Sequence, residues 1–291
     1  MEHRALGKSG IEVSVVGLGC NNFGGRLGVE ETRRVVDAAL DAGVDFLDTA
    51  DIYGNRGDSE RFLGEVLEGR RDRVVLATKF GHDMGDGETV RGSREYMRRA
   101  VDASLARLRT DRVDLLYYHR PDGVTPLGET VEAMQELVRE GKARAIGCSN
   151  LDATQMQEAG SRIAALQNHY SLLERADDAE VLPLCRELGV SYIPYFPLAS
   201  GLLTGKHRRG EIQTGTRLEG RKIEDAEFDR VEALERFATE RGHTLLELAF
   251  GGLLSQDVIA SVIAGATKPE QVRANVAAAD WRPALDELAL A

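Results

Sequence analysis

The stretch DFLDTADIYG, residues 45–54, decides the fold. It begins as an apolar run typical of a buried strand, but it ends in two aspartates, Asp48 and Asp51, and a tyrosine, Tyr53. A buried carboxylate without a partner is costly, so acids at the end of such a strand need either partners or a chemical task. The rest of the chain must therefore supply groups that meet these acids.

Short apolar runs alternate with amphipathic segments along the rest of the chain. The apolar residues of the amphipathic segments recur at helical spacing, and several of these segments stop at a glycine, as helices ending in a residue with positive φ do. About eight such strand–helix units can be counted, the number that closes a (β/α)8 barrel. The apolar runs include VVGLG (15–19), VVLATK (74–79) and DLLYYH (114–119), and the terminating glycines are Gly43, Gly141 and Gly189.

We therefore expect one α/β domain over residues 1–291, a (β/α)8 TIM barrel with an additional C-terminal helix. A short N-terminal β-hairpin is predicted where HRAL (3–6) and IEVS (11–14) are joined by the turn signal GKSG. A doubly wound sheet is the alternative architecture. Its GxGxxG turn is missing, however, because GLGCNNFGG has Asn22 where the third glycine should be.

Composition excludes several classes of function. The net charge of −11 argues against a nucleic-acid partner, because neutralising phosphates requires a basic face. The three cysteines are widely spaced and the six histidines lack metal-ligand spacing, so we expect neither disulfides nor a metal site. The N-terminus has no secretory pattern, and no apolar run approaches the roughly 20 residues that span a bilayer. We expect a cytoplasmic monomer or weak homo-oligomer without a membrane partner.

Polar side chains close the predicted strands, and barrel enzymes carry their chemistry at these carboxyl ends. Taken singly, each has an ordinary explanation, such as a capping aspartate, a strand-end lysine extending to solvent or a packed histidine. An acid, a phenol, an ammonium and an imidazole at the ends of consecutive strands are harder to explain separately. The residues expected at the mouth are Asp48, Tyr53, Lys79, His119, Ser149, Asn150, Gln167, Asn168 and Tyr195.

Four of these residues suit a general-acid site. A free tyrosine titrates near 10, and a neighbouring ammonium lowers that pKa. Lys79, paired with Asp48 and facing Tyr53, is expected to have this effect. A neutral His119 would orient a carbonyl oxygen while Tyr53 protonates it. The alternative is an aldolase or lyase in which Lys79 forms a Schiff base.

Successive blocks of the chain resemble the aldo-keto reductases in content and in order, over almost the whole length. The resemblance implies a metal-free (β/α)8 barrel that binds NADPH and reduces aldehydes or ketones, with Asp48, Tyr53, Lys79 and His119 at the four catalytic positions. Some members of that family are instead ion-channel subunits that bind the cofactor, so a non-catalytic role is a second alternative. The blocks are GLGCNNFGG, DFLDTADIYG, VVLATKFG, DLLYYHRPD, AIGCSN, LQNHYSLLER, PYFPLASGLLTGK and GATKPEQVRAN.

The family's cofactor positions carry over one residue at a time. The resemblance implies that Ser149, Asn150 and Gln167 bond the nicotinamide carboxamide and that Tyr195 stacks on the nicotinamide ring. The turn PYFPLASG (194–201) corresponds to the segment that wraps the pyrophosphate. The cofactor residues implied are Gly19, Cys20, Asn21, Asp48, Ser149, Asn150, Gln167, Tyr195, Phe196, Pro197, Leu198, Ala199, Ser200, Gly201, Lys206, Gly265, Ala266, Thr267, Gln271 and Asn275.

The adenosine end departs from the family pattern. Gln271 stands where the family usually has an arginine for the 2′-phosphate, and Ala274 replaces a glutamate. Some branches of that family tolerate the glutamine, and Lys268 or Arg273 could supply the charge instead, so NADPH is the expected cofactor and NADH is possible. The simpler interpretation of this segment is only a capped helix, with Thr267 as N-cap. The short tail, WRPALDELALA (281–291), predicts that no long C-terminal lid covers the substrate.

Overall fold

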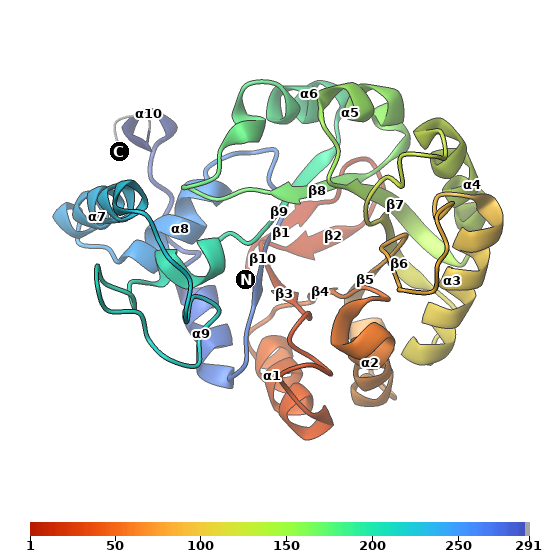
Figure 1. The fold of residues 1–291 in the computed structure, drawn as a ribbon, viewed down its shortest axis with the longest axis horizontal. Helices are drawn as coiled ribbons and strands as arrows, with labels where there is room; N and C mark the ends of the chain where they lie inside the picture. Colours follow the sequence, from red (N-terminus) through yellow and green to blue (C-terminus); the bar gives the residue numbers. More distant parts are fainter. Residues whose placement is uncertain (289–291) are drawn as a thin grey trace.

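The computed structural model describes residues 1–288 and contains an eight-stranded parallel barrel surrounded by helices (Figure 1). The strand order is β10-β3-β4-β5-β6-β7-β8-β9. The barrel closes between β9 and the segment before β10, where Tyr192 N donates to Val258 O (2.8 Å) and Ala260 N donates to Tyr192 O (3.2 Å). The strands are β3 (Val16–Gly19), β4 (Phe46–Asp48), β5 (Val75–Phe80), β6 (Val113–Tyr118), β7 (Ala143–Ser149), β8 (Ala165–His169), β9 (Ser191–Tyr195) and β10 (Val262–Gly265).

Helices follow the strands as the periodicity predicts, and the expected (β/α)8 barrel is confirmed. The last three residues of the predicted domain, 289–291, lie outside the described part of the chain. Ser93 is the N-cap of the helix that begins at Arg94, since its side chain accepts from Tyr96 N. The helices are α1 (Val29–Asp41), α2 (Tyr53–Val66), α3 (Arg94–Leu108), α4 (Leu127–Arg139), α5 (Ala153–Ala159), α6 (Val181–Leu188), α7 (Asp225–Glu240), α8 (Leu245–Leu254), α9 (Pro269–Ala277) and α10 (Leu285–Leu288).

The expected N-terminal hairpin closes one end of the barrel. Its strands β1 (His3–Ala5) and β2 (Glu12–Ser14) pair antiparallel. Three of its apolar side chains are buried in one cluster with barrel-interior residues from seven of the eight strands and from the segment that precedes β10. The Arg4 guanidinium donates to backbone carbonyls that precede β10, including that of Ile259 at 2.8 Å. The buried hairpin side chains are Leu6, Ile11 and Val13.

Inside the barrel, a glycine makes room for a buried tyrosine. Tyr117 is fully buried there, and Gly147 on the neighbouring strand lies against its ring. A Cβ atom at Gly147 would lie 2.6 Å from the Tyr117 ring, too close for any side chain. Gly147 therefore makes room for the tyrosine at the level where the polar residues of the mouth begin.

Two further features bear on the chain as a whole. Cys20, Cys148 and Cys185 are all buried and unpaired, and burial raises the pKa of each thiol. Residues 1–288 contain no helix long and apolar enough to cross a membrane.

Candidate active site

The four predicted catalytic residues meet at the carboxyl ends of three adjacent strands. Lys79, from β5, pairs with the Asp48 carboxylate at the end of β4 and donates to Thr49 O at 2.8 Å. The Lys79 Nζ atom lies 5.1 Å from the centre of the Tyr53 ring. The Tyr53 and His119 rings are 5.9 Å apart and meet edge to face. The structure thus brings the acid, the phenol, the ammonium and the imidazole together.

Tyr53 is held at the mouth by an unusual start to helix α2. Residues 54–57 have positive φ, so the chain makes a left-handed turn directly after the tyrosine. A Cβ atom at Gly54 would lie 2.3 Å from the carbonyl oxygen of Phe23, so only glycine fits this approach. The position of Tyr53 therefore depends on Gly54, the last residue of the stretch DFLDTADIYG.

The Asp48 carboxylate has partners for both oxygens. Oδ1 accepts from Lys79, and Oδ2 accepts from Gln167 Nε2 at 2.9 Å. Gln167, which the resemblance assigned to the cofactor carboxamide, is therefore also tied to the predicted catalytic group. Burying an acid at this strand end is tolerated because the acid is paired.

Asp51 has a different environment. Asp51 is 2% exposed, and its Oδ1 has no hydrogen-bond partner within residues 1–288. Unlike Asp48 and Tyr53, it does not line the cavity at the mouth of the barrel. Burial and the nearby Glu60 carboxylate raise the pKa of Asp51 to about 8. Glu60 itself accepts from Arg107 Nε at 2.7 Å and from Thr78 Oγ1 at 2.5 Å. The second aspartate of the motif thus belongs to a buried network behind the site.

The charge states of the site follow from burial and from the ion pair. Burial lowers the pKa of Lys79, but Asp48 and Tyr53 raise it, and the net shift is upward. Lys79 therefore stays an ammonium. Burial raises the pKa of Tyr53, whereas the Lys79 ammonium lowers it, and here too the net shift is upward. The expectation of a net lowered pKa at Tyr53 is wrong for this structure, because desolvation of the phenolate outweighs the ammonium.

His119 is held neutral, as expected. Burial lowers the pKa of this imidazole well below its usual value, and the charges of Lys79, His82 and Arg120 act in the same direction. The His82 ring lies 5.1 Å from the His119 ring. A neutral imidazole carries one N–H group, so it can donate a hydrogen bond to a carbonyl oxygen.

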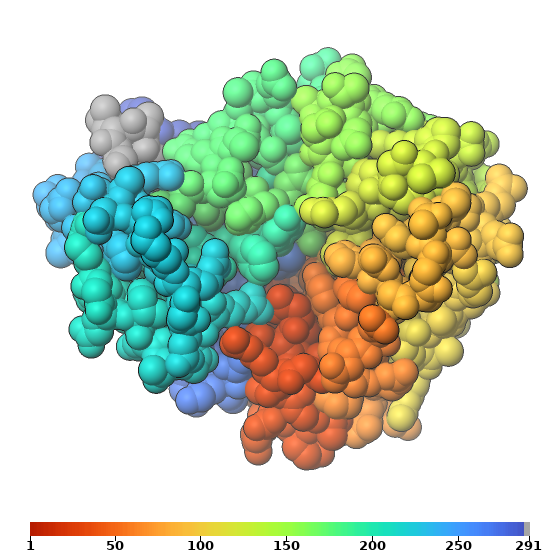
Figure 2. Space-filling model, viewed as in Figure 1, coloured from red at the N-terminus to blue at the C-terminus, as the bar shows by residue number. Residues whose placement is uncertain are grey.

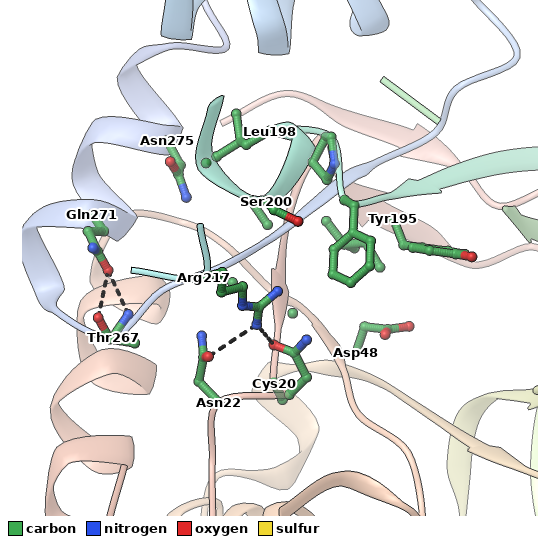
Figure 3. Close-up of a pocket in the computed structure, with 18 of the residues that line it drawn as sticks. Cys20, Asn22, Asp48, Tyr195, Leu198, Ser200, Arg217, Thr267, Gln271 and Asn275 are labelled. Carbon is green, nitrogen blue, oxygen red and sulfur yellow. Dashed lines mark hydrogen bonds between the residues drawn. The ribbon is translucent and has the colours of Figure 1, made fainter. Parts of the chain in front are cut away.

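A cavity of about 590 Å³ runs from these residues to helix α9 (Figure 3). On the molecular surface it opens between the segment after β9 (teal) and the N-terminal third of the chain (red and orange; Figure 2). Most of the predicted cofactor residues line it, namely Gly19, Cys20, Asn21, Asp48, Ser149, Asn150, Gln167, Tyr195, Phe196, Pro197, Leu198, Ser200, Gly201, Lys206, Gly265, Thr267, Gln271 and Asn275.

Several predicted positions are corrected. Ala199 and Ala266 do not line the cavity, and Ala266 is almost fully buried. Asn168 faces out of the barrel, where its side chain bonds the backbone of Leu151 and the Asp177 carboxylate. Side chains alternate along a strand, so Asn168 and its inward-facing neighbour Gln167 cannot share one face.

The residues predicted to hold a carboxamide are already joined to one another. Asn150, which has φ of 60°, donates to His119 O at 2.9 Å and to Ser149 Oγ at 3.0 Å. Its Oδ1 accepts from the Tyr195 hydroxyl at 2.8 Å. This network fixes the Asn150 amide and the Tyr195 ring relative to each other.

At the other end of the cavity, helix α9 begins differently from the simpler interpretation. Its N-cap is Lys268, not Thr267. Gln271 Oε1 accepts from Thr267 N at 2.6 Å and from Thr267 Oγ1 at 3.1 Å (Figure 3). Neither Lys268 nor Arg273 lines the cavity, and Arg273 pairs with Glu270 on the helix surface. The expected replacement for the missing arginine charge is therefore not in place.

The sequence reasoning missed Arg217, which enters the cavity from the loop between β9 and α7. Its Nη2 donates to Asn21 Oδ1 at 2.8 Å and to Asn22 Oδ1 at 3.2 Å (Figure 3). Its guanidinium lies 5.6 Å from the centre of the Phe196 ring. The loop shows no periodicity that would have indicated this contact. Other lining residues not assigned from the sequence are Asn22, Arg26, His82, Arg120, Thr204, His207, Gly215, Thr216, Leu246, Ile263, Ala264 and Ala274.

The lining fits an elongated anionic cofactor. Arg26, Lys206 and Arg217 place positive charge along it, while Tyr195 offers an aromatic face beside the amides of Asn150 and Gln167. Phosphates need such cations, and a flat heteroaromatic ring needs such a face. A chain with a net charge of −11 thus concentrates cations where an anion would bind.

Comparisons with known proteins agree with this arrangement. A sequence model described as "Aldo/keto reductase family" matches residues 15–288. The chain is 36% identical to a "Probable voltage-gated potassium channel subunit beta" of Arabidopsis thaliana, covering 100% of this chain and 94% of that protein. It is also 36% identical to the "Uncharacterized oxidoreductase YqkF" of Bacillus subtilis (99% and 94%). Identity to the "L-glyceraldehyde 3-phosphate reductase" of Escherichia coli K12 is 34% (96% and 87%).

Proposed function

The chain belongs to the aldo/keto reductase family, and from this premise we propose that it reduces aldehyde or ketone carbonyls to alcohols with NADPH. Membership of the family and the relatives named as oxidoreductases support carbonyl reduction with a nicotinamide cofactor. The single observation that carries the finer proposal is the Lys79–Asp48 ion pair beside Tyr53, with a neutral His119 across from it.

The residues divide the chemistry among them. A nicotinamide cofactor bound in the cavity would supply the hydride for the carbonyl carbon. Tyr53 gives its hydroxyl proton to the carbonyl oxygen, so the product is an alcohol and Tyr53 is left as a phenolate. The Lys79 ammonium, oriented by Asp48, stabilises that phenolate. His119, kept neutral, donates a hydrogen bond that positions the carbonyl oxygen near the Tyr53 hydroxyl.

The raised pKa of Tyr53 is compatible with this role. A phenol with a raised pKa stays protonated at neutral pH and is therefore ready to donate. Lys79 opposes the effect of burial, so the cost of forming the phenolate is lower than in an apolar pocket without the ammonium. Burial thus keeps Tyr53 protonated, and the Lys79 ammonium lowers the free-energy cost of releasing that proton.

The cofactor is assigned to the long cavity. Ser149, Asn150 and Gln167 would hold the carboxamide, and Tyr195 would pack on the ring. Arg217 and Lys206 would face the phosphates. NADPH remains the expected cofactor by resemblance, but Gln271 supplies no positive charge for a 2′-phosphate, so we expect NADH to be accepted as well.

Replacement of Tyr53 by phenylalanine tests the proposal. The variant should lose about 10²- to 10⁴-fold in kcat, because it lacks the proton donor while the ring and its packing remain. The measurement is the fall in reduced-nicotinamide absorbance with an aromatic aldehyde, and NADPH affinity, followed by fluorescence, should be nearly unchanged. Full turnover by Tyr53→Phe would refute the assignment of the acid.

A non-catalytic role is the second candidate, because two relatives are named as probable potassium channel subunits. Tight NADPH binding without turnover across a broad panel of carbonyls would favour it. The Schiff-base alternative is opposed by the charge state of Lys79, which is fully buried and paired. Borohydride trapping of a substrate on Lys79 would reverse that conclusion.

A further inference from the structure

Arg120 is a cation at the cavity that the proposed reaction does not use. It follows His119 directly, on the loop after β6, and its side chain is exposed and lines the cavity. Within residues 1–288 it makes no hydrogen bond or ion pair through its guanidinium. Most other arginines within residues 1–288 donate to carboxylates or backbone carbonyls. Among the arginines that line the cavity, Arg217 bonds Asn21, whereas Arg26 and Arg120 have no guanidinium partner in the described part of the chain.

The cations of the cavity fall into two groups. Burial lowers the pKa of Arg217, and the positive charge of Arg26 lowers it further, so these two arginines lie close together. Arg120 instead acts with burial to lower the pKa of His119. It also opposes the rise that burial causes in the pKa of Tyr195. Arg120 therefore lies at the catalytic end of the cavity, whereas Arg217, bonded to Asn21, lies along the part assigned to the phosphates.

The catalytic end also lacks an anion to neutralise Arg120. Asp48 is the one carboxylate among the described lining residues, and both of its oxygens are engaged by Lys79 and Gln167. His82 adds a second hydrogen-bonding group beside His119. A neutral, apolar substrate would leave the exposed Arg120 guanidinium to solvent at the end of the cavity where the substrate must bind.

We propose that Arg120, assisted by His82, binds the anionic group of a short carbonyl substrate whose oxygen lies between Tyr53 and His119. The substrate class is an aldehyde or ketone that carries a carboxylate or a phosphate. Arginine forms paired, charge-assisted hydrogen bonds with both of these groups, so the chemistry they share defines the site. The inference rests on the proposed carbonyl reduction and makes Arg120 a residue that determines specificity.

Two matched substrate pairs test this role. Succinic semialdehyde against butanal reports on a carboxylate, and glyceraldehyde 3-phosphate against glyceraldehyde reports on a phosphate. The wild-type protein should prefer the anionic member of at least one pair in kcat/KM, and the pair with the larger preference identifies the anion. Arg120→Gln should lower kcat/KM for the preferred anionic substrate about 10- to 100-fold and change the uncharged partner less than about threefold.

A control variant separates local recognition from total charge. Arg139→Gln removes one exposed arginine from the end of α4, away from the cavity lining, and should leave both ratios unchanged. Arg120→Lys should recover part of the preference, because it restores charge without the paired donors. Equal losses on charged and uncharged substrates, or a preference that survives in Arg120→Gln, would overturn the proposal.

Failure of the proposed reduction can be recognised independently. If wild-type protein reduces no member of either pair with NADPH or NADH, carbonyl reduction of this class is refuted. Calorimetric binding of glyceraldehyde 3-phosphate and of succinic semialdehyde to the NADPH complex then decides the role of Arg120. Binding at least tenfold weaker in Arg120→Gln than in Arg139→Gln supports the anion site, and equal binding refutes it.

Discussion

Asp48 and Asp51 lie three positions apart and are each 2% exposed, yet only Asp48 has a cation within hydrogen-bonding distance. The difference arises from the direction in which each side chain leaves the strand end. Asp48 faces the barrel mouth and meets Lys79. Asp51 faces the layer between the barrel and its helices, where it meets Glu60, whose charge is already balanced by Arg107.

The raised pKa of Asp51 predicts a pH-dependent stability. The folded protein holds a proton on this carboxyl up to about pH 8, whereas the unfolded chain releases it near pH 4. The stabilisation is thus complete below pH 4 and is lost as pH rises from about 4 to 8. Asp51→Asn should remove this contribution, which is on the order of 1 kcal/mol per pH unit in that window.

Urea unfolding of wild type and Asp51→Asn at pH 5 and pH 8.5 measures the effect. The free energy of unfolding of the wild type should fall more between these two values than that of the variant. Glu132→Gln, which alters an exposed carboxyl on α4, should behave as the wild type does. Parallel pH profiles for wild type and Asp51→Asn would mean that Asp51 is ionised in the folded state.

At the scale of single residues, the sequence predicted which groups meet but not all of their charge states. Residue types at the ends of successive strands were enough to bring Asp48, Tyr53, Lys79 and His119 together. The sign of the pKa shift at Tyr53 depends on how much water the barrel excludes, and no local pattern records that. Burial raises this pKa and Lys79 lowers it, and the balance between the two effects is set by the folded structure.

Among the elements, helix α9 sets the expected cofactor preference. Its first turn places Gln271 against Thr267, where the neutral side-chain amide accepts from Thr267 N and Oγ1 and brings no charge to the cavity. Gln271→Arg should tighten NADPH binding about tenfold relative to NADH, because a guanidinium adds a charge-assisted contact to the 2′-phosphate. The comparison is the ratio of the two dissociation constants, measured by titration of protein fluorescence.

Gln271→Met is the matched control for this substitution. It removes the bond to Thr267 without adding charge, so any change in affinity should be the same for both cofactors. A ratio that Gln271→Arg leaves unchanged would place the 2′-phosphate away from the start of α9. A preference for NADPH gained in Gln271→Arg would instead support the proposal that Gln271 allows NADH to be accepted.

Elements with a regular period could be predicted, whereas the long loop after β9 could not. The loop between residues 205 and 224 takes its path from distant anchors. Arg209 pairs with Asp225 and Asp229 at the start of α7, and Arg217 bonds Asn21 at its other side. Such contacts depend on which side chains the barrel brings within reach, so neither Arg217 nor its partner could be assigned from spacing.

At the scale of the whole molecule, the two ends of the barrel have separate tasks. The hairpin fills one end with apolar side chains, and the polar residues occupy the other. Leu6→Ala should lower the free energy of unfolding by about 2–5 kcal/mol, because it leaves a cavity in the closed end. Turnover per folded molecule should be retained at temperatures well below unfolding.

Denaturant titration and steady-state kinetics on the same preparation check this separation. Leu285→Ala, at a half-exposed position, should change stability by less than about 0.5 kcal/mol. A loss of kcat per folded molecule in Leu6→Ala, at temperatures well below unfolding, would show that the two ends are coupled. The barrel itself could be predicted because strand–helix units can be counted, while its closure by the hairpin depends on packing that the count does not describe.

The three sequestered sulfur atoms make this protein its own reporter of unfolding. An alkylating reagent reacts with a thiolate that it can reach, and in the native barrel none of the three is reachable or readily ionised. Cys20 directly follows β3, Cys148 lies in β7, and Cys185 lies on the buried side of helix α6. The order in which they become labelled in rising urea would therefore map which part of the barrel opens first, without any engineered probe.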